Sequence, residues 1–233
     1  TSDELQIQLS VRDYVSQNIQ PNIGQWWDEG IFPTNLITEF GSAGLLGANL
    51  SSDYGMSGIS NVAYGLVMYE LEKVDSGLRS FVSVQGALVM YPILTYGSKE
   101  QRDEYLPKMS RGELVGCFGL TEPDGGSDPS AMNTIASDDG DYYIINGIKM
   151  WITNGTIADV ALIWARDQNN DIRGFLVDTK TKGFQANLIK RKLSLRVSDT
   201  AELVLTDVRI HKSKMLPGIK GLKGPLSCLT QAR

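Results

Sequence analysis

The sequence predicts an α+β protein in which an all-helical N-terminal part is followed by a small β-barrel or β-sandwich. Apolar residues recur at helical spacing through the first half of the chain, and beyond Gly112 the pattern changes to short β-rich runs separated by turn residues. We therefore expect a helical domain over residues 1–111 and a β domain over residues 112–217. Residues 218–233 are expected to form a linker and the start of a further helical domain.

The helices are expected in four stretches of the first half. Residues 3–18 carry spaced apolar positions among polar ones, and a second apolar segment follows Pro33. Residues 61–94 are apolar on most sides, which indicates buried helices. Ser98 and Gln101 have the spacing of a capping box, so a fourth helix is expected to begin there.

The strands are expected in a regular series after the change of pattern. Residues 141–152, DYYIINGIKMWI, form the clearest β-rich run, and Asn146-Gly147 within it favours a hairpin with a type I′ turn. Further strands are expected at residues 160–166, 172–177, 184–189 and 202–210. Gly224-Pro225 then indicates the cap and first position of a new helix. Because that helix would have hardly two turns before Arg233, we expect the protein to be interrupted there.

Composition limits the classes of function. The 233 residues are 42% hydrophobic and 21% charged with a net charge of −5, which is typical of a soluble globular protein and argues against a nucleic-acid partner. No apolar run is expected to approach the ~20 residues of a membrane span. Cys117 and Cys228 lack metal-ligand spacing and are interpreted as reduced thiols rather than a disulfide. His211, the only histidine, is expected at a strand end rather than in a catalytic triad, and a zinc site is not expected.

Two segments of the β domain have the composition of a binding site. Residues 117–130, CFGLTEPDGGSDPS, place two glycines in a polar turn, whose backbone N–H groups, with Thr121 and Ser127, could hold a pyrophosphate or a polar ring edge. In residues 149–154, KMWITN, alternation puts Trp151 and Thr153 on one side of a strand, which suits a flat heteroaromatic ring that also needs a hydrogen bond. The alternatives are an ordinary Gly- and Asp-rich loop and a core tryptophan beside a surface threonine.

A third segment is a polar stripe in the helical half. Glu72, Ser76, Arg79 and Ser83 fall on one face if the helix is continuous, among apolar neighbours. A buried polar stripe is expected to be paired or to contact a ligand, and an arginine there suits a carboxylate. The alternative is a solvated face with an ordinary Glu–Arg pair.

These three segments, in this order, resemble the acyl-CoA dehydrogenase family. CFGLTEPDGGSDP and KMWITN are similar to its flavin-binding segments. ELEKVDSGLRSFVSVQGALVM and YGSKEQRDEYLPKMSRGELVGCFGLTEP are similar to the glutaryl-CoA dehydrogenase branch, and the resemblance runs from about residue 33 to residue 233. It implies an N-terminal helical domain, a middle β domain and a C-terminal helical bundle, of which the bundle is absent from this chain.

The resemblance implies FAD between the middle and C-terminal domains. The Thr153 hydroxyl is then expected near the flavin N5, where hydride arrives, and no metal is expected. The residues that match the family's flavin contacts are Phe118, Leu120, Thr121, Gly126, Ser127, Trp151, Ile152 and Thr153.

For the acyl-CoA substrate, the resemblance implies Arg79 and Ser80 near a distal carboxylate, with Glu72 and Ser83 in support. Ser127 is also expected to touch the substrate. The segment from Leu226 to Arg233 resembles the one that runs along the CoA moiety. Thr230-Gln231 departs from the usual pair of asparagines, which puts one CoA contact in doubt.

The implied reaction is α,β-dehydrogenation of glutaryl-CoA, with or without loss of CO₂ to give crotonyl-CoA. A base removes the α-proton while the β-hydride leaves to the flavin, and no residue of this chain matches the family's catalytic glutamate. The alternatives are a dehydrogenase of another acyl-CoA and a truncated, non-catalytic binding or scaffold protein. The resemblance also implies an electron-transfer flavoprotein as acceptor, a homotetramer at full length, and a cytoplasmic location in a bacterium or the mitochondrial matrix in a eukaryote.

Overall fold

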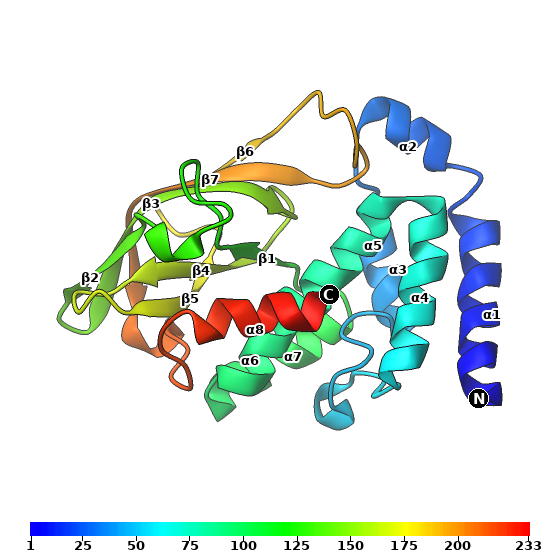
Figure 1. The fold of residues 1–233 in the computed structure, drawn as a ribbon, viewed down its shortest axis with the longest axis horizontal. Helices are drawn as coiled ribbons and strands as arrows, with labels where there is room; N and C mark the ends of the chain where they lie inside the picture. The colour runs from blue at the N-terminus through cyan, green and yellow to red at the C-terminus, as the bar shows by residue number, and fades with distance from the viewer.

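The N-terminal half folds into helices that stand beside a curled sheet, as the computed structural model of residues 1–233 shows (Figure 1). Helix α1 (Ser2–Asn18) begins with a capping box between Thr1 and Glu4 and packs on α4 (Asn61–Val74). Between α1 and α4 in the sequence come α2 (Ile23–Glu29), α3 (Leu36–Ser42) and the 3₁₀ turn η1 (Ser52–Tyr54). Helix α2 was not predicted, because none of its residues is buried and the sequence there lacks an apolar stripe.

The apolar run 61–94 forms two helices rather than one. Helix α4 ends at Asp75, whose backbone is extended and whose carboxylate accepts a hydrogen bond from Gly77 N at 2.7 Å to begin α5 (Ser76–Ser83). From there the chain stays helical through a π-helical segment, η2 (Val84–Met90), into α6 (Tyr91–Tyr96). The break turns the axis between Glu72 and Ser76, so the polar stripe crosses two helices.

This second helix runs through the middle of the protein. Residues 76–96 have the length and hydropathy of a membrane-spanning helix, which the sequence analysis did not anticipate. Within the protein, however, 72% of its most apolar window is buried. The helix packs against α4, β1 and the C-terminal helix, so it is an interior helix here. Helix α7 (Lys99–Ser110) follows, and its predicted capping box between Ser98 and Gln101 is confirmed.

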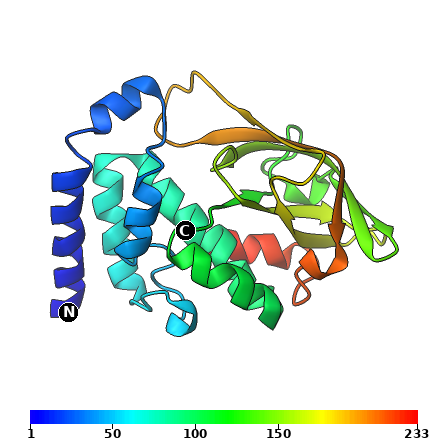
Figure 2. The same ribbon diagram turned by 180° about the vertical axis from the view of Figure 1, so that it is seen from behind.

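The second half forms one seven-stranded sheet with the order β1-β4-β2-β3-β7-β6, in which β5 pairs with β4 off this path. Most neighbours are antiparallel, whereas β1 and β2 each pair with β4 in parallel. The strands are β1 (Gly116–Gly119), β2 (Ile135–Asp139), β3 (Tyr142–Thr153), β4 (Val160–Arg166), β5 (Ile172–Asp178), β6 (Phe184–Leu188) and β7 (Thr200–His211). The predicted α+β class, with a helical part followed by a curled β part, is confirmed (Figures 1 and 2).

The predicted hairpin at Asn146-Gly147 is wrong. These residues lie inside the continuous strand β3, and the turn between β2 and β3 falls at Gly140-Asp141 instead. At Asn146 the pairing with β7 shifts by one residue, and the Asn146 amide exchanges hydrogen bonds with Asp207, which has a φ of 51°. The Asn-Gly pair therefore accommodates a bulge in the neighbouring strand rather than a turn.

The chain ends in helix α8 (Lys223–Ala232), which begins one residue before the predicted Gly224-Pro225 start. It lies across η2 and α6, and Tyr96 Oη is 2.7 Å from Ser227 Oγ. The 3₁₀ turns η3 (Pro129–Ala131) and η4 (Lys212–Lys214) complete the fold. The last helix of the N-terminal part ends at Ser110, and the first strand begins at Gly116.

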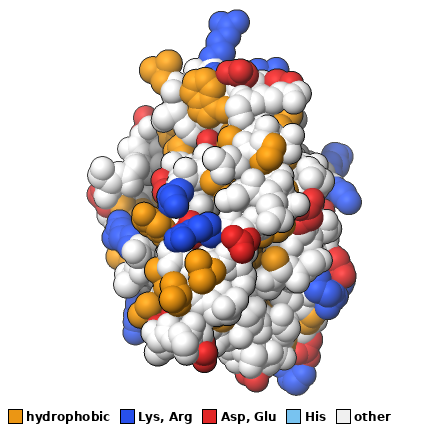
Figure 3. Space-filling model, turned by 90° about the vertical axis from the view of Figure 1, so that its right-hand side faces the viewer, with side chains coloured by type: hydrophobic (Ala, Val, Ile, Leu, Met, Phe, Trp, Pro, Cys, Tyr) orange, Lys and Arg blue, Asp and Glu red, His pale blue; other side chains and the backbone are white.

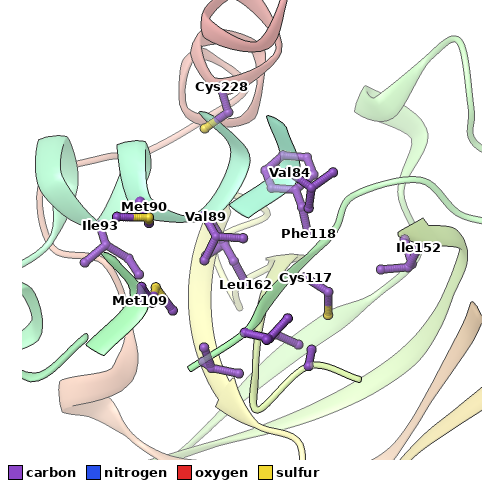
Figure 4. Close-up of a cluster of buried hydrophobic side chains, with 14 of the residues drawn as sticks. Val84, Val89, Met90, Ile93, Met109, Cys117, Phe118, Ile152, Leu162 and Cys228 are labelled. Carbon is purple, nitrogen blue, oxygen red and sulfur yellow. The ribbon is translucent and has the colours of Figure 1, made fainter. Parts of the chain in front are cut away.

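One core of 50 buried side chains joins helices and sheet. Figure 4 shows this junction: Val84, Val89, Met90 and Ile93 of the interior helix approach Phe118 and Leu162 of the sheet, with Cys228 of α8 above them. Cys117 and Cys228 are both free and buried, as predicted, and burial raises the pKa of Cys228 to about 12. The helix–sheet junction is thus a firm framework for anything that binds beside it.

Candidate ligand-binding cleft

A cavity of about 350 Å³ opens where the interior helix, the sheet and α8 meet. Its volume falls in the range of small-molecule sites. All eight residues that the resemblance assigned to a flavin line it, together with Leu226 and Arg233 from the expected substrate segment. The full lining is Val84, Leu88, Phe118, Leu120, Thr121, Gly126, Ser127, Pro129, Trp151, Ile152, Thr153, Leu226, Leu229 and Arg233.

One wall of this cleft is apolar. Val84 and Leu88 come from the π-helical segment, and Leu226 and Leu229 come from α8. A π-helix changes which side chains share a face, and such segments often occur at functional sites. Sequence reasoning missed Val84 and Leu88 as lining residues, because the helical period does not reveal a π-helical register.

The other wall carries hydroxyl groups that have no protein partner. Thr121, Ser127 and Thr153 line the cleft, and none of their hydroxyls forms a hydrogen bond within the protein. A Cβ at Gly126 would meet no atom within 4 Å, so the turn beside Ser127 leaves open space. The cleft therefore suits a ligand with one apolar face and polar groups along an edge.

Strand β3 ends in an unusual backbone that presents Trp151 to this cleft. The pairs Lys149↔Leu203 and Ile152↔Ala201 enclose an extra residue on β3, so a bulge contains Met150 and Trp151. Trp151 has a φ of 63°, which is rare for a bulky residue, and its side chain is 61% exposed. The same bulge keeps Trp151 and Thr153 on the open side with Ile152 buried between them, as the sequence predicted for the strand.

A buried ion pair lies directly behind the cleft. Lys149 Nζ is 2.8 Å from Glu122 Oε1, and the two side chains are 0% and 4% exposed. Burial lowers the pKa of Lys149 to about 8, although Glu122 acts against the shift. Burial also acts to raise the pKa of Glu122, but the hydrogen bonds from Lys149 and Thr134 outweigh it and leave the pKa below its ordinary value. Neither residue was singled out from the sequence, although Glu122 belongs to the segment 117–130 and Lys149 to the segment 149–154, because their neighbours in these segments line the cleft.

A second cavity, of about 520 Å³, lies on another side of Arg233, which lines both cavities. Arg79 and Ser83 line it, with Tyr64 and the Thr230-Gln231 pair. Ser80 and Glu72 line neither cavity. Instead, Glu72 accepts hydrogen bonds from Arg79 Nε at 2.8 Å and from Ser76 Oγ at 2.6 Å.

The polar stripe is therefore not buried as expected. Arg79 is 36% exposed and Glu72 is 45% exposed, because the break at Asp75 brings this part of the helix pair to the surface. The structure thus agrees with the alternative of an ordinary Glu–Arg pair as far as Glu72 is concerned. Arg79 and Ser83, however, still line the second cavity, which shares Arg233 with the first.

Neither cavity is lined by an aspartate, a glutamate or a histidine. His211 lies at the end of β7, where its Nδ1 is 2.8 Å from Ser213 Oγ, and no cluster of metal-ligating side chains forms. A third cavity, of about 480 Å³, reaches Trp151 and Thr153 from the side of residues 189–195, which include Lys190, Arg191 and Lys192. The first two cavities therefore offer binding surfaces but no carboxylate or imidazole that could remove a proton.

The fold and cleft define a two-domain α+β protein with a cleft at the junction of a helical domain and a curled sheet. The model of the acyl-CoA dehydrogenase N-terminal domain matches residues 1–113, and that of the acyl-CoA dehydrogenase middle domain matches residues 117–208. The chain belongs to the acyl-CoA dehydrogenase family.

Solved structures and curated relatives agree with this. A glutaryl-CoA dehydrogenase from Mycobacterium smegmatis, crystallised with FADH₂, is 52% identical with a TM-score of 0.97 over all of this chain and 60% of its own. Butyryl-CoA dehydrogenase from Megasphaera elsdenii is 31% identical with a TM-score of 0.93 over all of this chain and 63% of its own. The mitochondrial short-chain specific acyl-CoA dehydrogenase of Rattus norvegicus is 32% identical over 97% of this chain and 56% of its own. The chain thus spans about 60% of the length of the relatives it matches.

Proposed function

We propose that this chain supplies the N-terminal and middle domains of an FAD-dependent acyl-CoA dehydrogenase that acts on glutaryl-CoA. The observation that carries the proposal is that all eight residues expected at the flavin line one cleft, and that Arg233 lines both this cleft and a second cavity lined by Arg79. The eight residues come from two segments, 118–127 and 151–153, which the fold brings together at one cleft.

The residues of the cleft fit a flavin. Trp151 offers an exposed aromatic face, Val84 and Leu88 offer an apolar wall, and the free hydroxyls of Thr121 and Thr153 offer hydrogen bonds to a ring edge. The open space at Gly126 leaves room for a bulky anionic group beside Ser127. When bound, the flavin supplies a hydride acceptor for the β-carbon of the substrate.

The acyl-CoA is assigned to the second cavity and its junction with the first. Arg79 contacts Glu72 through Nε alone, which leaves its two Nη groups for a carboxylate at the far end of the acyl chain. This feature favours a dicarboxylic substrate such as glutaryl-CoA. Because butyryl-CoA and short-chain dehydrogenases are about 31–32% identical to the chain, a monocarboxylic acyl-CoA is the second candidate.

In this proposal the chain binds and orients the flavin and the acyl-CoA, and it excludes water from one side of the reacting atoms. The base that removes the α-proton lies outside the two cavities, since no carboxylate or imidazole lines them. Whether CO₂ is lost from the substrate also depends on groups outside the two cavities. Partners and setting follow as further proposals: an electron-transfer flavoprotein as acceptor, a homotetramer, and the cytoplasm of a bacterium or the mitochondrial matrix of a eukaryote.

A visible spectrum and a substrate panel test the proposal on the protein that contains this chain. We expect a yellow protein with flavin bands and a higher kcat/KM for glutaryl-CoA than for butyryl-CoA, measured with a dye acceptor. A flavoprotein that prefers butyryl-CoA would favour the second candidate. A protein that takes up no FAD at micromolar concentration would contradict the enzyme altogether and leave a scaffold that retains only the fold.

A further inference from the structure

The buried Lys149–Glu122 pair touches all the segments that form the polar wall of the cleft, although neither residue lines it. Lys149 Nζ donates to Leu120 O at 3.2 Å and to Glu122 Oε1 at 2.8 Å. Leu120 and Thr121 line the cleft from the segment 117–130, directly after β1. Lys149 lies two residues before Trp151 in the segment 149–154. The pair therefore links the end of β1 to the end of β3.

The same residue, Glu122, also holds the glycine turn. Glu122 and Gly125 exchange backbone hydrogen bonds of 3.1 Å, which closes the turn that leads to Gly126 and Ser127. The Glu122 side chain accepts hydrogen bonds from the backbone N–H of Asn133 at 2.5 Å and of Thr134 at 3.0 Å, where the loop returns to the sheet. The loop that carries Ser127 is thus tied at its start to the Glu122 backbone and at its end to the Glu122 carboxylate.

The conformation of Trp151 depends on the same region. Met150 N donates to Thr121 O at 2.8 Å, between Lys149 and the bulged tryptophan. A bulky residue at a φ of 63° costs free energy and persists only where its surroundings hold it. On either side of the bulge Lys149 pairs with Leu203 and Ile152 with Ala201, and Lys149 Nζ bonds Leu120 O, next to Thr121.

Stability alone does not account for a pair in this position. Two charges this deeply buried lose hydration, and replacement of a buried ion pair by uncharged groups of similar volume is often neutral or stabilising. We propose that Lys149 and Glu122 are positioning residues that fix the spacing between the Ser127 turn and the Trp151 bulge, and so set the geometry in which the flavin is held. This inference rests on the proposed function, because it assigns the pair a role toward the ligand of that cleft.

The test uses the flavin-loaded protein that contains this chain and a double variant, Glu122→Gln with Lys149→Met. The double variant removes both charges with little change of volume and leaves no unpaired buried ion. We expect it to fold with a midpoint of thermal unfolding close to that of the wild type. We expect the Kd for FAD to rise at least about tenfold, with a shift of the flavin absorption bands and of its reduction potential.

A matched control is the Asp167–Arg173 pair, which is also largely buried, with 3.3 Å between Arg173 Nε and Asp167 Oδ2, and which lines neither cavity. The variant Asp167→Asn with Arg173→Met is expected to keep the wild-type flavin spectrum and Kd. Thr134→Val serves where the double variant fails to fold. It removes one hydrogen bond from a neutral hydroxyl to the Glu122 carboxylate and leaves the ion pair in place, so we expect a smaller rise in Kd, about two- to fivefold.

Failure of this inference is distinguishable from failure of the proposed function. If the wild-type protein binds no FAD, the proposed function is wrong. If the wild type binds FAD and the double variant keeps its Kd, spectrum and potential, the pair only supports the fold. Equal losses in the Asp167–Arg173 control would likewise overturn the positioning role.

Discussion

Arg79 forms an ion pair with Glu72 across the break between α4 and α5, with 2.8 Å between Arg79 Nε and Glu72 Oε2. Ser76 donates a second hydrogen bond to the same carboxylate, which holds Glu72 in place. The guanidinium is therefore fixed at the wall of the second cavity by one edge, while its other edge is free. Such an arrangement orients an arginine toward a carboxylate without satisfying it.

We predict that Arg79→Ala lowers kcat/KM for glutaryl-CoA far more than for butyryl-CoA. Loss of a hydrogen bond to a charged group costs about 1.5–3 kcal/mol, which corresponds to roughly 10- to 100-fold. Steady-state kinetics with both substrates check this. Arg12→Ala, which breaks the pair with Glu70 on another face, is the control and is expected to leave the ratio unchanged. Equal losses for the two substrates would mean that Arg79 supports only the fold.

Thr153→Val is predicted to change the redox behaviour of the flavin without releasing it. The Thr153 hydroxyl has no protein partner and lines the cleft, so it is available to the ligand. A neutral hydrogen bond of this kind is worth about 0.5–1.5 kcal/mol. Potentiometric titration of the bound flavin measures the effect, and Thr206→Val on the exposed part of β7 is the matched control. An unchanged potential in Thr153→Val would show that the hydroxyl does not reach the ring.

Much of the fold could be predicted because local signals and tertiary packing agree. The capping box at Ser98 and the strand at residues 160–166 are short-range patterns that the packed protein keeps. Helix α2 could not be predicted, since it buries nothing and its helical backbone depends on the surroundings. The break at Asp75 was also not predicted, because the stripe from Glu72 to Ser83 was placed on one continuous helix.

The site was predictable in its residues but not in its support. Motif residues that face the cleft, such as Thr121 and Trp151, follow from resemblance and strand alternation. The Lys149–Glu122 pair depends on two positions 27 residues apart in sequence meeting behind the cleft, which only the fold reveals. The bulges in β3 and β7 are likewise set by pairing between distant strands, so Asn146-Gly147 carried a turn signal that the sheet overrode.

Gly147→Ala is predicted to destabilise the protein although Gly147 lies within a strand. A Cβ there would sit 2.4 Å from Thr134 Oγ1 and 2.8 Å from Thr134 Cα, so backbone would have to move. Overpacking of this kind costs about 1–3 kcal/mol. Denaturant unfolding measures the loss. Gly24→Ala, where a Cβ meets nothing within 4 Å on helix α2, is the control and is expected to be neutral or slightly stabilising. A neutral Gly147→Ala would contradict the close approach of β3 to Thr134.

Glu70 is predicted to make the stability of the helical domain sensitive to acid. The hydrogen bond from Arg12 is the main reason that its pKa falls to about 2, with Gln8 and Lys73 contributing. Because this pKa lies below that of the unfolded chain, the stabilisation is present above about pH 4.5 and is lost as the pH falls toward about 2. Its size is on the order of 2 kcal/mol, reduced because Arg12 and Lys73 are about half exposed.

The comparison of wild type with Glu70→Gln measures this contribution. The difference between their free energies of unfolding is expected to narrow as the pH is lowered through that window. Glu113→Gln, which alters an exposed pair with Arg111, is the control and is expected to show a weaker pH dependence. A constant difference for Glu70→Gln from pH 6 to pH 3 would show that the carboxylate is not stabilised in its charged form.

The 233-residue chain by itself is predicted to have no dehydrogenase activity. No carboxylate or imidazole lines the flavin cleft or the cavity lined by Arg79. Loss of a general base lowers the rate about 10²- to 10⁴-fold. Leu226 on α8 is also exposed, as are Leu5, Leu9, Val62 and Tyr69 on α1 and α4. Figure 3 shows apolar side chains in small groups among charged ones on one face of the molecule. Grouped apolar side chains of this kind favour association, so we expect the purified chain to self-associate or to pair with a complementary domain.

Turnover of glutaryl-CoA with a dye acceptor, together with size-exclusion chromatography, measures both effects. We expect activity to appear only when a helical domain matching the part of the relatives that this chain does not span is supplied in trans. Arg79→Ala in that mixture is the control for substrate recognition, and it is expected to reduce the restored activity toward glutaryl-CoA. Turnover by the 233 residues alone would place a proton acceptor within this chain, and the hydroxyl-bearing wall formed by Thr121, Ser127 and Thr153 would then be the first place to look for it.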